Sequence, residues 1–200
     1  MNNLQDFMIS RVRVKLMELF FLHPEELYYV REITRVVKEE INAVRRELDK
    51  MLEYGLLKSE ERGNRLYYNL NRKYVLYSEL QRMIAKTTGI GLKIRKLKRK
   101  LGNVEFVMFS GRFVEGLNPK KDEVEVLIVG EIVLPELQAV MKEEEVRLSR
   151  EINYSVLKKE EFEFRKTRRD PFVMEILYGT RVMVIGSEID FTQRQIEGLS

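Results

Sequence analysis

The stretch INAVRRELDKMLEYGLLKSEERGNRLYYNL, residues 41–70, changes its hydrophobic period halfway along, and this change decides the fold of the first half of the chain. Up to residue 54 the apolar residues recur at helical spacing, whereas residues 56–59 and 65–70 have the pattern of short strands. Gly63-Asn64, between the two strand-like runs, is typical of the tip of a β-hairpin. The stretch therefore predicts a helix followed directly by a hairpin.

The predicted helix, Ile41–Tyr54, has one apolar and one polar face. Its apolar face carries Ile41, Val44, Leu48, Met51 and Leu52. The polar face carries Asn42, Arg45, Arg46 and Asp49, at positions i, i+3, i+4 and i+7. Gly55 follows the helix, where a C′ cap is expected.

Two further helices precede this one. Apolar residues at helical spacing predict the first over Ile9–Leu22, and His23-Pro24 ends it. The second is shorter, and its expected buried side is formed by Tyr29, Val30, Ile33, Val36 and Val37. The first 70 residues thus predict three helices and then a hairpin.

This order, with VREITRVV (30–37), INAVRRELDKMLEYGLL (41–57) and ERGNRLYYNL (61–70), resembles the winged helix-turn-helix transcription regulators of the MarR and ArsR kind. In such a unit the third helix enters the major groove of double-stranded DNA, where Asn reads adenine and Arg reads guanine, and the arginines of the hairpin lie along phosphates. The expected base-reading residues are Asn42, Arg45 and Arg46, with Lys50 nearer the backbone. The expected phosphate contacts are Lys58, Arg62 and Arg65. Two alternatives stay open, because exposed charges often only solvate a helix and winged helices also bind proteins.

A fourth amphipathic helix, Tyr74–Lys86, follows the hairpin. In regulators of this type such a helix pairs with its twin, which predicts a homodimer with Tyr77 and Met83 at the seam. The alternative is that the helix packs against its own domain. Thr87–Gly91 breaks the helix and marks the expected domain boundary.

The next segment, LKIRKLKRKLG (92–102), interleaves six cations with apolar residues. Either it is a basic amphipathic helix that lies on DNA phosphates, or it is the solvated face of a helix whose Ile94, Leu97 and Leu101 are core. The expected domains are 1–88, a DNA-binding domain with its following helix, 89–103, a basic linker or helix, and 104–200.

The second half of the chain alternates strand-like and helical segments. The predicted strands are Val104–Phe109, Val124–Val129, Ile152–Leu157 and Arg181–Ile185. The predicted helices are Leu134–Ser149, Lys158–Thr167 and one that runs from Asp170 to about Tyr178. The expected fold class is α+β in two domains, the second an α/β domain with a mixed sheet.

Within this half, GRFVEGLNPKKDEVEVLIVG (111–130), the DPF of 170–172 and the YGTRVMVIG ending resemble the minimal nucleotidyltransferase domains of the DNA polymerase β superfamily. The resemblance places Gly111, Arg112 and Gly116 in the phosphate-binding loop. It places Glu123 and Glu125 where the family has two aspartates that hold Mg²⁺ or Mn²⁺.

Most of the residues that carry function in that motif are replaced in this sequence. Glutamate is one methylene longer than aspartate, and octahedral magnesium tolerates little error in ligand position. Arg112 replaces a serine, Glu115 replaces an arginine, and Asn153 stands where a third carboxylate is expected. We therefore expect a catalytically inactive domain without a cofactor. The alternative function is a Mg- or Mn-dependent nucleotidyltransferase that uses Glu123 and Glu125, and an antitoxin-type enzyme is one form of this alternative. DEVEV (122–126) also fits an edge strand with alternating exposed acids and buried valines.

Composition and charge agree with a DNA-binding protein. Residues 1–100 hold 22 Lys and Arg against 13 Asp and Glu, net +9, and residues 101–200 hold 14 against 19, net −5. A basic half attracts polyanions. The 200 residues include no cysteine and a single histidine, which excludes disulfides and histidine or thiolate metal clusters. No apolar run approaches the roughly 20 residues that span a bilayer. We expect a cytoplasmic transcriptional regulator with no membrane contact. Some members of the family that the second half resembles belong to toxin–antitoxin pairs, and the resemblance therefore also allows a protein partner.

Overall fold

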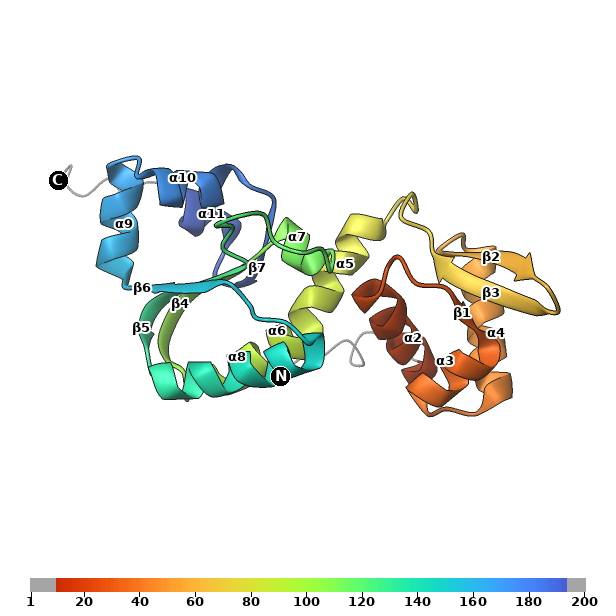
Figure 1. Cartoon of the computed structure of the whole chain (residues 1–200). Coiled ribbons are helices and arrows are strands. Elements are labelled where there is room, and N and C mark those ends of the chain that lie inside the picture. Colours follow the sequence, from red (N-terminus) through yellow and green to blue (C-terminus); the bar gives the residue numbers. More distant parts are fainter. Residues whose placement is uncertain (1–9, 194–200) are drawn as a thin grey trace. The chain divides into compact units, whose positions relative to one another are not determined.

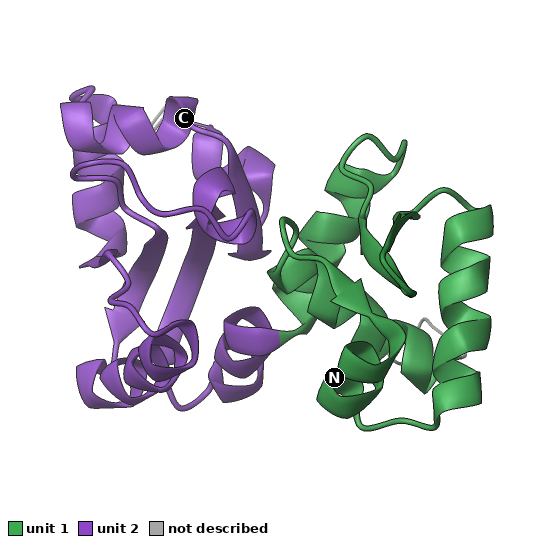
Figure 2. Ribbon diagram, turned by 45° about the vertical axis from the view of Figure 1, so that its right-hand side comes forward, with its two compact units in different colours: residues 1–88 green, residues 89–200 purple. Residues whose placement is uncertain are grey.

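The computed structural model describes residues 10–193, and its chain divides into two compact units, residues 1–88 and 89–200 (Figure 2). The fold is mixed α+β with two separate sheets, as expected from the sequence. Ile9, the first residue of the first expected helix, lies outside the described residues. In the described part of the chain, no helix is both long and apolar enough to cross a membrane.

Unit 1 contains four helices and a three-stranded sheet in its described residues (Figure 1). In chain order the elements are α2 (Arg11–Leu22), β1 (Tyr28–Tyr29), α3 (Val30–Val37), α4 (Ile41–Glu53), β2 (Leu57–Arg62), β3 (Arg65–Leu70) and α5 (Tyr77–Thr87). The predicted helices and the hairpin are confirmed. The strand β1 was not predicted, because two residues are too few to show a hydrophobic period. It pairs antiparallel with β3, on the side of β3 opposite β2.

The core of unit 1 lies between α2, α3, α4 and the hairpin. Leu16, Ile33, Val44 and Leu48 are completely buried there. Val36, which we expected on the buried side of α3, is instead 56% exposed. The reason is helical geometry, because Ile33 and Val37, four residues apart, already fill the single inward stripe of this short helix.

Unit 2 is a four-stranded sheet with helices on both faces (Figure 1). Its elements are α6 (Gly89–Leu97), β4 (Gly102–Ser110), α7 (Gly111–Val114), β5 (Val126–Ile132), α8 (Leu134–Leu148), β6 (Tyr154–Leu157), α9 (Lys159–Thr167), α10 (Pro171–Tyr178), β7 (Arg181–Ile185) and α11 (Glu188–Thr192). The strand order is β6-β5-β4-β7, in which β5 and β6 are parallel and the other pairs antiparallel. The prediction of a mixed sheet is confirmed, whereas α7 and α11 were not predicted.

Both faces of this sheet are buried because β4 and β5 alternate two sets of apolar residues. On one face, α9, α10 and α11 cover Phe106, Met108 and Leu127, with Phe162 and Phe191 stacked at 4.9 Å between ring centroids. On the other face lie α6 and α8 (Figure 1). Val107 and Phe109 alternate with the first set along β4 and are equally buried.

The segment 89–103, expected as a linker or helix, is an integral part of unit 2. Its first nine residues form α6, and the buried Ile90, Ile94 and Leu101 tie the segment to this unit. Gly102 then starts β4. The boundary between the units therefore falls directly between Thr88 and Gly89, with no free linker.

Two glycines lie close together at the end of the β4–β5 pair where β4 begins, Gly102 opposite Ile132 and Gly130 opposite Val104. A Cβ at Gly102 would lie 2.2 Å from the carbonyl oxygen of Glu131, and one at Gly130 would lie 2.1 Å from that of Asn103. Both have positive φ, and a β-bulge between Val104 and Phe106 follows. The two backbones approach this closely only because neither residue has a side chain.

Candidate functional site

Helix α4 presents a polar face to solvent because its other face is held in the core. Val44, Leu48 and Met51 are buried. Asn42, Arg45, Arg46, Asp49 and Lys50 are all exposed, so the predicted amphipathic face is confirmed. The helix begins at Glu40, whose carboxylate accepts the backbone N–H groups of Asn42 and Ala43, both at 2.8 Å. These two hydrogen bonds lower the pKa of Glu40 below its ordinary value of 4.5.

Glu47 is a buried acid that anchors α4 to α2. Its Oε2 accepts a hydrogen bond from Nε of Arg13 at 2.8 Å, and Nζ of Lys50 lies 3.9 Å from its Oε1. Burial would raise the pKa of Glu47, but hydrogen bonds from Arg13 and Ser10 outweigh it, and the pKa is lowered. Lys50, predicted near the DNA backbone, therefore lies beside an internal acid. The partner of Glu47 is 34 residues away in the chain, which no local pattern indicates.

The hairpin β2–β3 carries the three predicted phosphate contacts. Arg62 and Arg65 pair across the two-residue tip Gly63-Asn64, and Lys58 is exposed on β2. Arg62 forms an ion pair with Glu60, so its charge is already matched within the hairpin. The guanidinium of Arg65 lies over the ring of Tyr29, 4.6 Å from its centroid, which fixes the arginine beside α3.

Between α3, α4 and the hairpin lies a cavity of about 540 Å³, which we call the arginine hollow. Its lining residues are Tyr29, Val30, Arg31, Arg45, Asp49, Asn64, Arg65, Leu66 and Tyr68. Arg31, Arg45 and Arg65 come from three different elements, and none forms an ion pair within residues 10–193. Guanidinium groups bind phosphate oxygens with paired hydrogen bonds, so the hollow can accept a phosphate group.

Two further polar residues line the same hollow, the buried Tyr68 and the exposed Asp49. Burial raises the pKa of Tyr68, the charge of Asp49 raises it further, and Arg45 opposes the shift. Tyr68 therefore stays a neutral hydroxyl. Sequence reasoning missed Arg31, Tyr29 and Tyr68, although the position of Arg31 in the first turn of a helix just before α4 is a usable signal.

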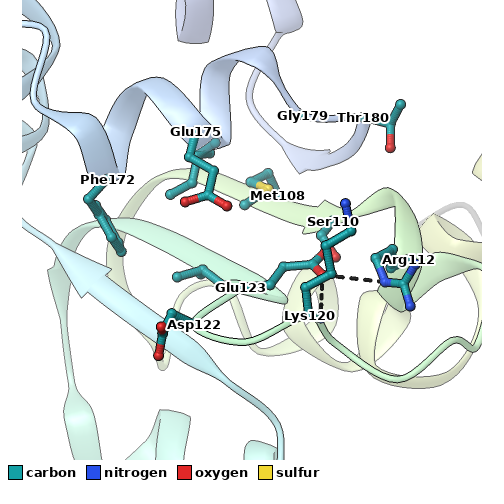
Figure 3. A pocket seen from close by; sticks show the side chains of 12 residues that line it. Met108, Ser110, Arg112, Lys120, Asp122, Glu123, Phe172, Glu175, Gly179 and Thr180 are labelled. Atoms are coloured by element: carbon teal, nitrogen blue, oxygen red, sulfur yellow. Dashed lines mark hydrogen bonds and ion pairs between the residues drawn. The ribbon is translucent and has the colours of Figure 1, made fainter.

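In unit 2 the expected phosphate-binding loop follows β4 (Figure 3). Ser110 caps the short helix α7, with its Oγ accepting the N–H of Phe113 at 3.2 Å, and the N–H of Gly111 donates to the carbonyl of Thr180 at 2.7 Å. Arg112 donates from Nε and Nη2 to the carbonyl of Asn118, at 3.1 and 2.8 Å, and lies 3.5 Å from Glu123. The guanidinium of Arg112 is therefore engaged inside its own loop.

A cavity of about 250 Å³ opens beside this loop, and we call it the loop pocket. Its lining residues are Met108, Ser110, Arg112, Lys120, Asp122, Glu123, Val124, Phe172, Glu175, Ile176, Gly179 and Thr180. Figure 3 shows Glu175 and Phe172 reaching down from α10 toward the loop that carries Asp122 and Glu123. Of the five residues predicted for a nucleotide site, Arg112 and Glu123 line the pocket, whereas Gly111, Gly116 and Glu125 do not.

Glu125 differs from the expected metal ligand in its partners and its burial. Its side chain is 0% exposed, and its two oxygens accept hydrogen bonds from Arg150 at 2.6 and 2.9 Å and from the N–H of Asn153 at 3.0 Å. Glu123 instead accepts the N–H of Lys120 at 2.8 Å. The edge-strand alternative is wrong, because β5 lies between β4 and β6 and this acid is not exposed.

The two carboxylates predicted to share an ion therefore have separate partners. Asn153, which stands where the family has a third carboxylate, contributes backbone groups to Glu125 rather than its side chain. Within residues 10–193, no three of the His, Asp and Glu side chains are grouped so that they could hold a metal ion. An internal arginine takes the place that a cation would have beside Glu125.

No protein-family model matches this chain, and no curated protein matches it. Among solved structures, part of the chain is similar to a mutant of Lactococcus lactis ZitR in complex with DNA. The TM-score is 0.37 at 20% sequence identity, and the match covers 52% of this chain and 69% of that chain. At this level of similarity the function has to be argued from the geometry of the chain itself.

Proposed function

We propose that this protein is a DNA-binding transcriptional regulator, and that unit 1 is a winged helix-turn-helix whose helix α4 enters the major groove of double-stranded DNA. Asn42, Arg45 and Arg46 project from the exposed face of α4, where side chains of these types read adenine and guanine. The order of helices followed by a hairpin supports the same arrangement.

The arginine hollow is the observation that carries this proposal. Arg31, Arg45 and Arg65 bring three positive charges to one cavity, and the protein supplies a single acid there, Asp49. Like charges that line one cavity repel one another, and a phosphate of the DNA backbone would relieve that repulsion. Lys58 on the hairpin adds a contact to the same backbone, while Arg62 has to exchange Glu60 for a phosphate before it can contribute.

The test is duplex affinity as a function of salt, measured by fluorescence anisotropy. We expect log K to fall linearly with log salt, and the double variant Arg45→Ala/Arg46→Ala to bind at least about 10-fold more weakly. The matched control is Lys73→Ala/Arg82→Ala, which removes the same charge from exposed positions outside α4 and the hairpin. If both double variants lose the same affinity for the duplex, the loss is explained by net charge alone, and the proposed role of α4 is wrong.

Sequence specificity needs its own measurement, because phosphate contacts alone do not make a regulator. A pull-down of fragmented genomic DNA with the full chain should enrich a small set of sites. Asn42→Ala should reduce this enrichment by a larger factor than it reduces the affinity for non-specific DNA. Uniform recovery of fragments would leave a DNA-binding protein without regulatory specificity.

We infer further that unit 2 is a nucleotidyltransferase-like domain without catalytic activity. The support is that Glu125 is neutralised by Arg150 and that Arg112 is bound to Asn118 and Glu123. Incubation with labelled nucleoside triphosphates and Mg²⁺ or Mn²⁺ should give no transfer to protein or small molecules. Turnover that Glu123→Ala abolishes would establish the alternative function, a metal-dependent nucleotidyltransferase.

The homodimer is also part of the proposal. Tyr77 stacks on Phe21 at 5.5 Å between centroids, and Met83 packs against the core of unit 1, so neither predicted seam residue is fully free. The exposed apolar residues at the start of α5 are Val75 and Leu76, 83% and 48% exposed. Sedimentation of the full chain should give a dimer that Val75→Glu/Leu76→Glu converts to a monomer.

A further inference from the structure

A group of four cations ends α6 and leads into β4. Lys96, Lys98, Arg99 and Lys100 are all exposed, and within the described part of the chain none of their side chains has an ion pair or a hydrogen bond. Lys93, one turn earlier, forms an ion pair with Glu143 of α8 at 2.7 Å. An acid is therefore within reach of α6, but the four later cations remain without one. We call these four residues the α6 cations.

The backbone beneath the α6 cations is held firmly. Ile94 and Leu101, on the inner side of the segment, are each 1% exposed, and the N–H groups of Lys100 and Leu101 both donate to the carbonyl of Leu97, at 2.8 and 2.9 Å. The four charges are thus carried by an ordered turn rather than by a flexible tail. An ordered turn binds a polyanion at a smaller loss of conformational entropy than a flexible chain does.

The α6 cations belong to a segment that is much more basic than the rest of unit 2. Residues 89–100 hold six Lys and Arg and no acid, whereas residues 101–200 hold 14 against 19. Without this segment unit 2 would repel DNA. With it, one place on an otherwise acidic unit attracts a polyanion.

The segment cannot be far from the end of unit 1. Helix α6 starts at Gly89, immediately after Thr88, and a rise of about 1.5 Å per residue puts Leu97 about 12 Å from Gly89 along the helix axis. A DNA duplex carries one charge per roughly 1.7 Å and continues on both sides of a bound domain. A duplex bound to unit 1 therefore has further phosphates on both sides of the bound domain.

We propose that the α6 cations form a second binding site for double-stranded DNA, located on unit 2 and directed at the phosphate backbone outside the footprint of α4. This proposal rests on the proposed function of unit 1. Three of the four residues are lysines, which bind phosphates as point charges and without fixed geometry. The site adds affinity and salt dependence to DNA binding and no base specificity.

The test compares two variants of the full chain that lose the same charge from unit 2. One is Lys98→Gln/Arg99→Gln/Lys100→Gln. The control is Lys121→Gln/Lys142→Gln/Lys158→Gln, three exposed lysines without a partner in the described residues. Binding to a random-sequence duplex of about 30 base pairs is measured from about 0.05 to 0.3 M salt. Circular dichroism and thermal unfolding check that both variants keep the fold.

Neutralising three phosphate contacts should reduce the slope of log K against log salt by about 2 to 3 and weaken binding at least about 10-fold at about 0.15 M salt. The control should keep the wild-type slope. A wild-type slope in the α6 variant overturns the second site while leaving unit 1 as a DNA-binding unit. If the wild-type chain shows no salt-dependent binding at all, the proposed function of unit 1 fails, and this inference with it.

Binding to vesicles that contain about 30% anionic lipid tests whether the α6 cations bind a membrane surface instead of DNA. Binding of the wild-type chain to these vesicles, lost in the α6 variant while the DNA slope is unchanged, would assign the α6 cations to lipid and overturn the proposal. Absence of vesicle binding together with the reduced DNA slope supports it.

Discussion

The arginines around α4 and those around the sheet of unit 2 have opposite environments. Arg31, Arg45 and Arg65 meet at one cavity without an ion pair in the described residues. Arg112 and Arg150 are instead bound to carbonyl and carboxylate groups of their own unit. The same side-chain chemistry thus serves two purposes. In the arginine hollow the charge has no ion-pair partner in the described residues, whereas at Arg112 and Arg150 it is used inside unit 2, and this contrast can be tested residue by residue.

The largest effect is expected for Arg150→Ala in unit 2. The substitution leaves the completely buried carboxylate of Glu125 with a single hydrogen bond, from Asn153. Removing one partner of a buried ion pair costs about 3–5 kcal/mol, and we expect the free energy of unfolding of unit 2 to fall by that amount. Urea unfolding followed by circular dichroism, with hydrogen exchange of the β5 amides, measures it.

The control for this prediction is Arg112→Ala. Its side chain is 37% exposed and its ion pair with Glu123 is partly solvated, so we expect a loss of about 1 kcal/mol or less. The double variant Arg150→Leu/Glu125→Leu should recover most of the stability, because it leaves no unpaired charge. Equal losses for Arg150→Ala and Arg112→Ala would contradict the contrast between the two arginines.

Arg31→Ala tests the opposite case in unit 1. Because Arg31 forms no ion pair in the described residues, its loss should leave the free energy of unfolding within about 0.5 kcal/mol of wild type. The slope of log K for duplex binding against log salt should decrease by about 1, with about 10-fold weaker binding. Arg35→Ala, on the same helix and exposed outside the hollow, is the control and should retain the wild-type slope. A stability loss above about 1 kcal/mol would mean that Arg31 serves the fold.

Gly63→Ala tests whether the hairpin that carries Arg65 must keep its tight tip. Gly63 has a φ of +58°, and no atom lies within 4 Å of an added Cβ, so the cost is backbone strain alone. We expect about 1 kcal/mol lower stability of unit 1, measured by urea unfolding. Asn64→Ala, at the neighbouring tip position, serves as the comparison. An unchanged stability for Gly63→Ala would show that the tip relaxes to another turn.

The smallest expected effect is a loss of stability of unit 1 at acidic pH. The pKa values of Glu39, Glu40 and Glu47 are lowered below 4.5 in the folded unit 1, so near and below that pH the unfolded chain binds more protons. Their contribution to stability is present above about pH 4.5 and is lost as the pH falls through the lowered values. Glu18, whose pKa burial raises, acts in the opposite direction.

The stability of unit 1 should therefore decrease between about pH 5 and about pH 3, as measured by thermal unfolding at each pH. Glu40→Gln, which still offers an oxygen to the amides of Asn42 and Ala43, should show a shallower decrease than wild type. Parallel curves for the two proteins would exclude Glu40 as a source of the acid sensitivity.

The sequence was sufficient for the elements that carry a local signal. The period of residues 41–70 predicted α4 and the hairpin, and the alternation of the second half predicted a mixed sheet. The elements it missed are short: β1 has two residues, α7 four and α11 five. Segments of this length contain too few residues to establish a period, and their formation depends on contacts with distant parts of the chain.

In the candidate sites, the sequence could predict only those features that depend on a single helix or strand. The exposed face of α4 follows from its own spacing, so the exposure of Asn42, Arg45 and Arg46 was predicted correctly. The arginine hollow joins three elements, and the burial of Glu125 depends on Arg150, 25 residues further along the chain. Ion pairing between such distant residues decides which charges stay free, and no spacing within a single helix or strand encodes it.

The close approach of β4 and β5 at Gly102 and at Gly130 constrains how this sequence can diverge. Each would place a Cβ about 2 Å from a backbone oxygen of the opposite strand, so a mutation at either position meets main chain rather than a movable side chain. A second substitution elsewhere cannot relieve that clash. Selection should therefore retain both glycines while the surrounding positions drift, and two glycines 28 residues apart, at one end of the β4–β5 pair, form a signature by which diverged homologues of unit 2 can be sought.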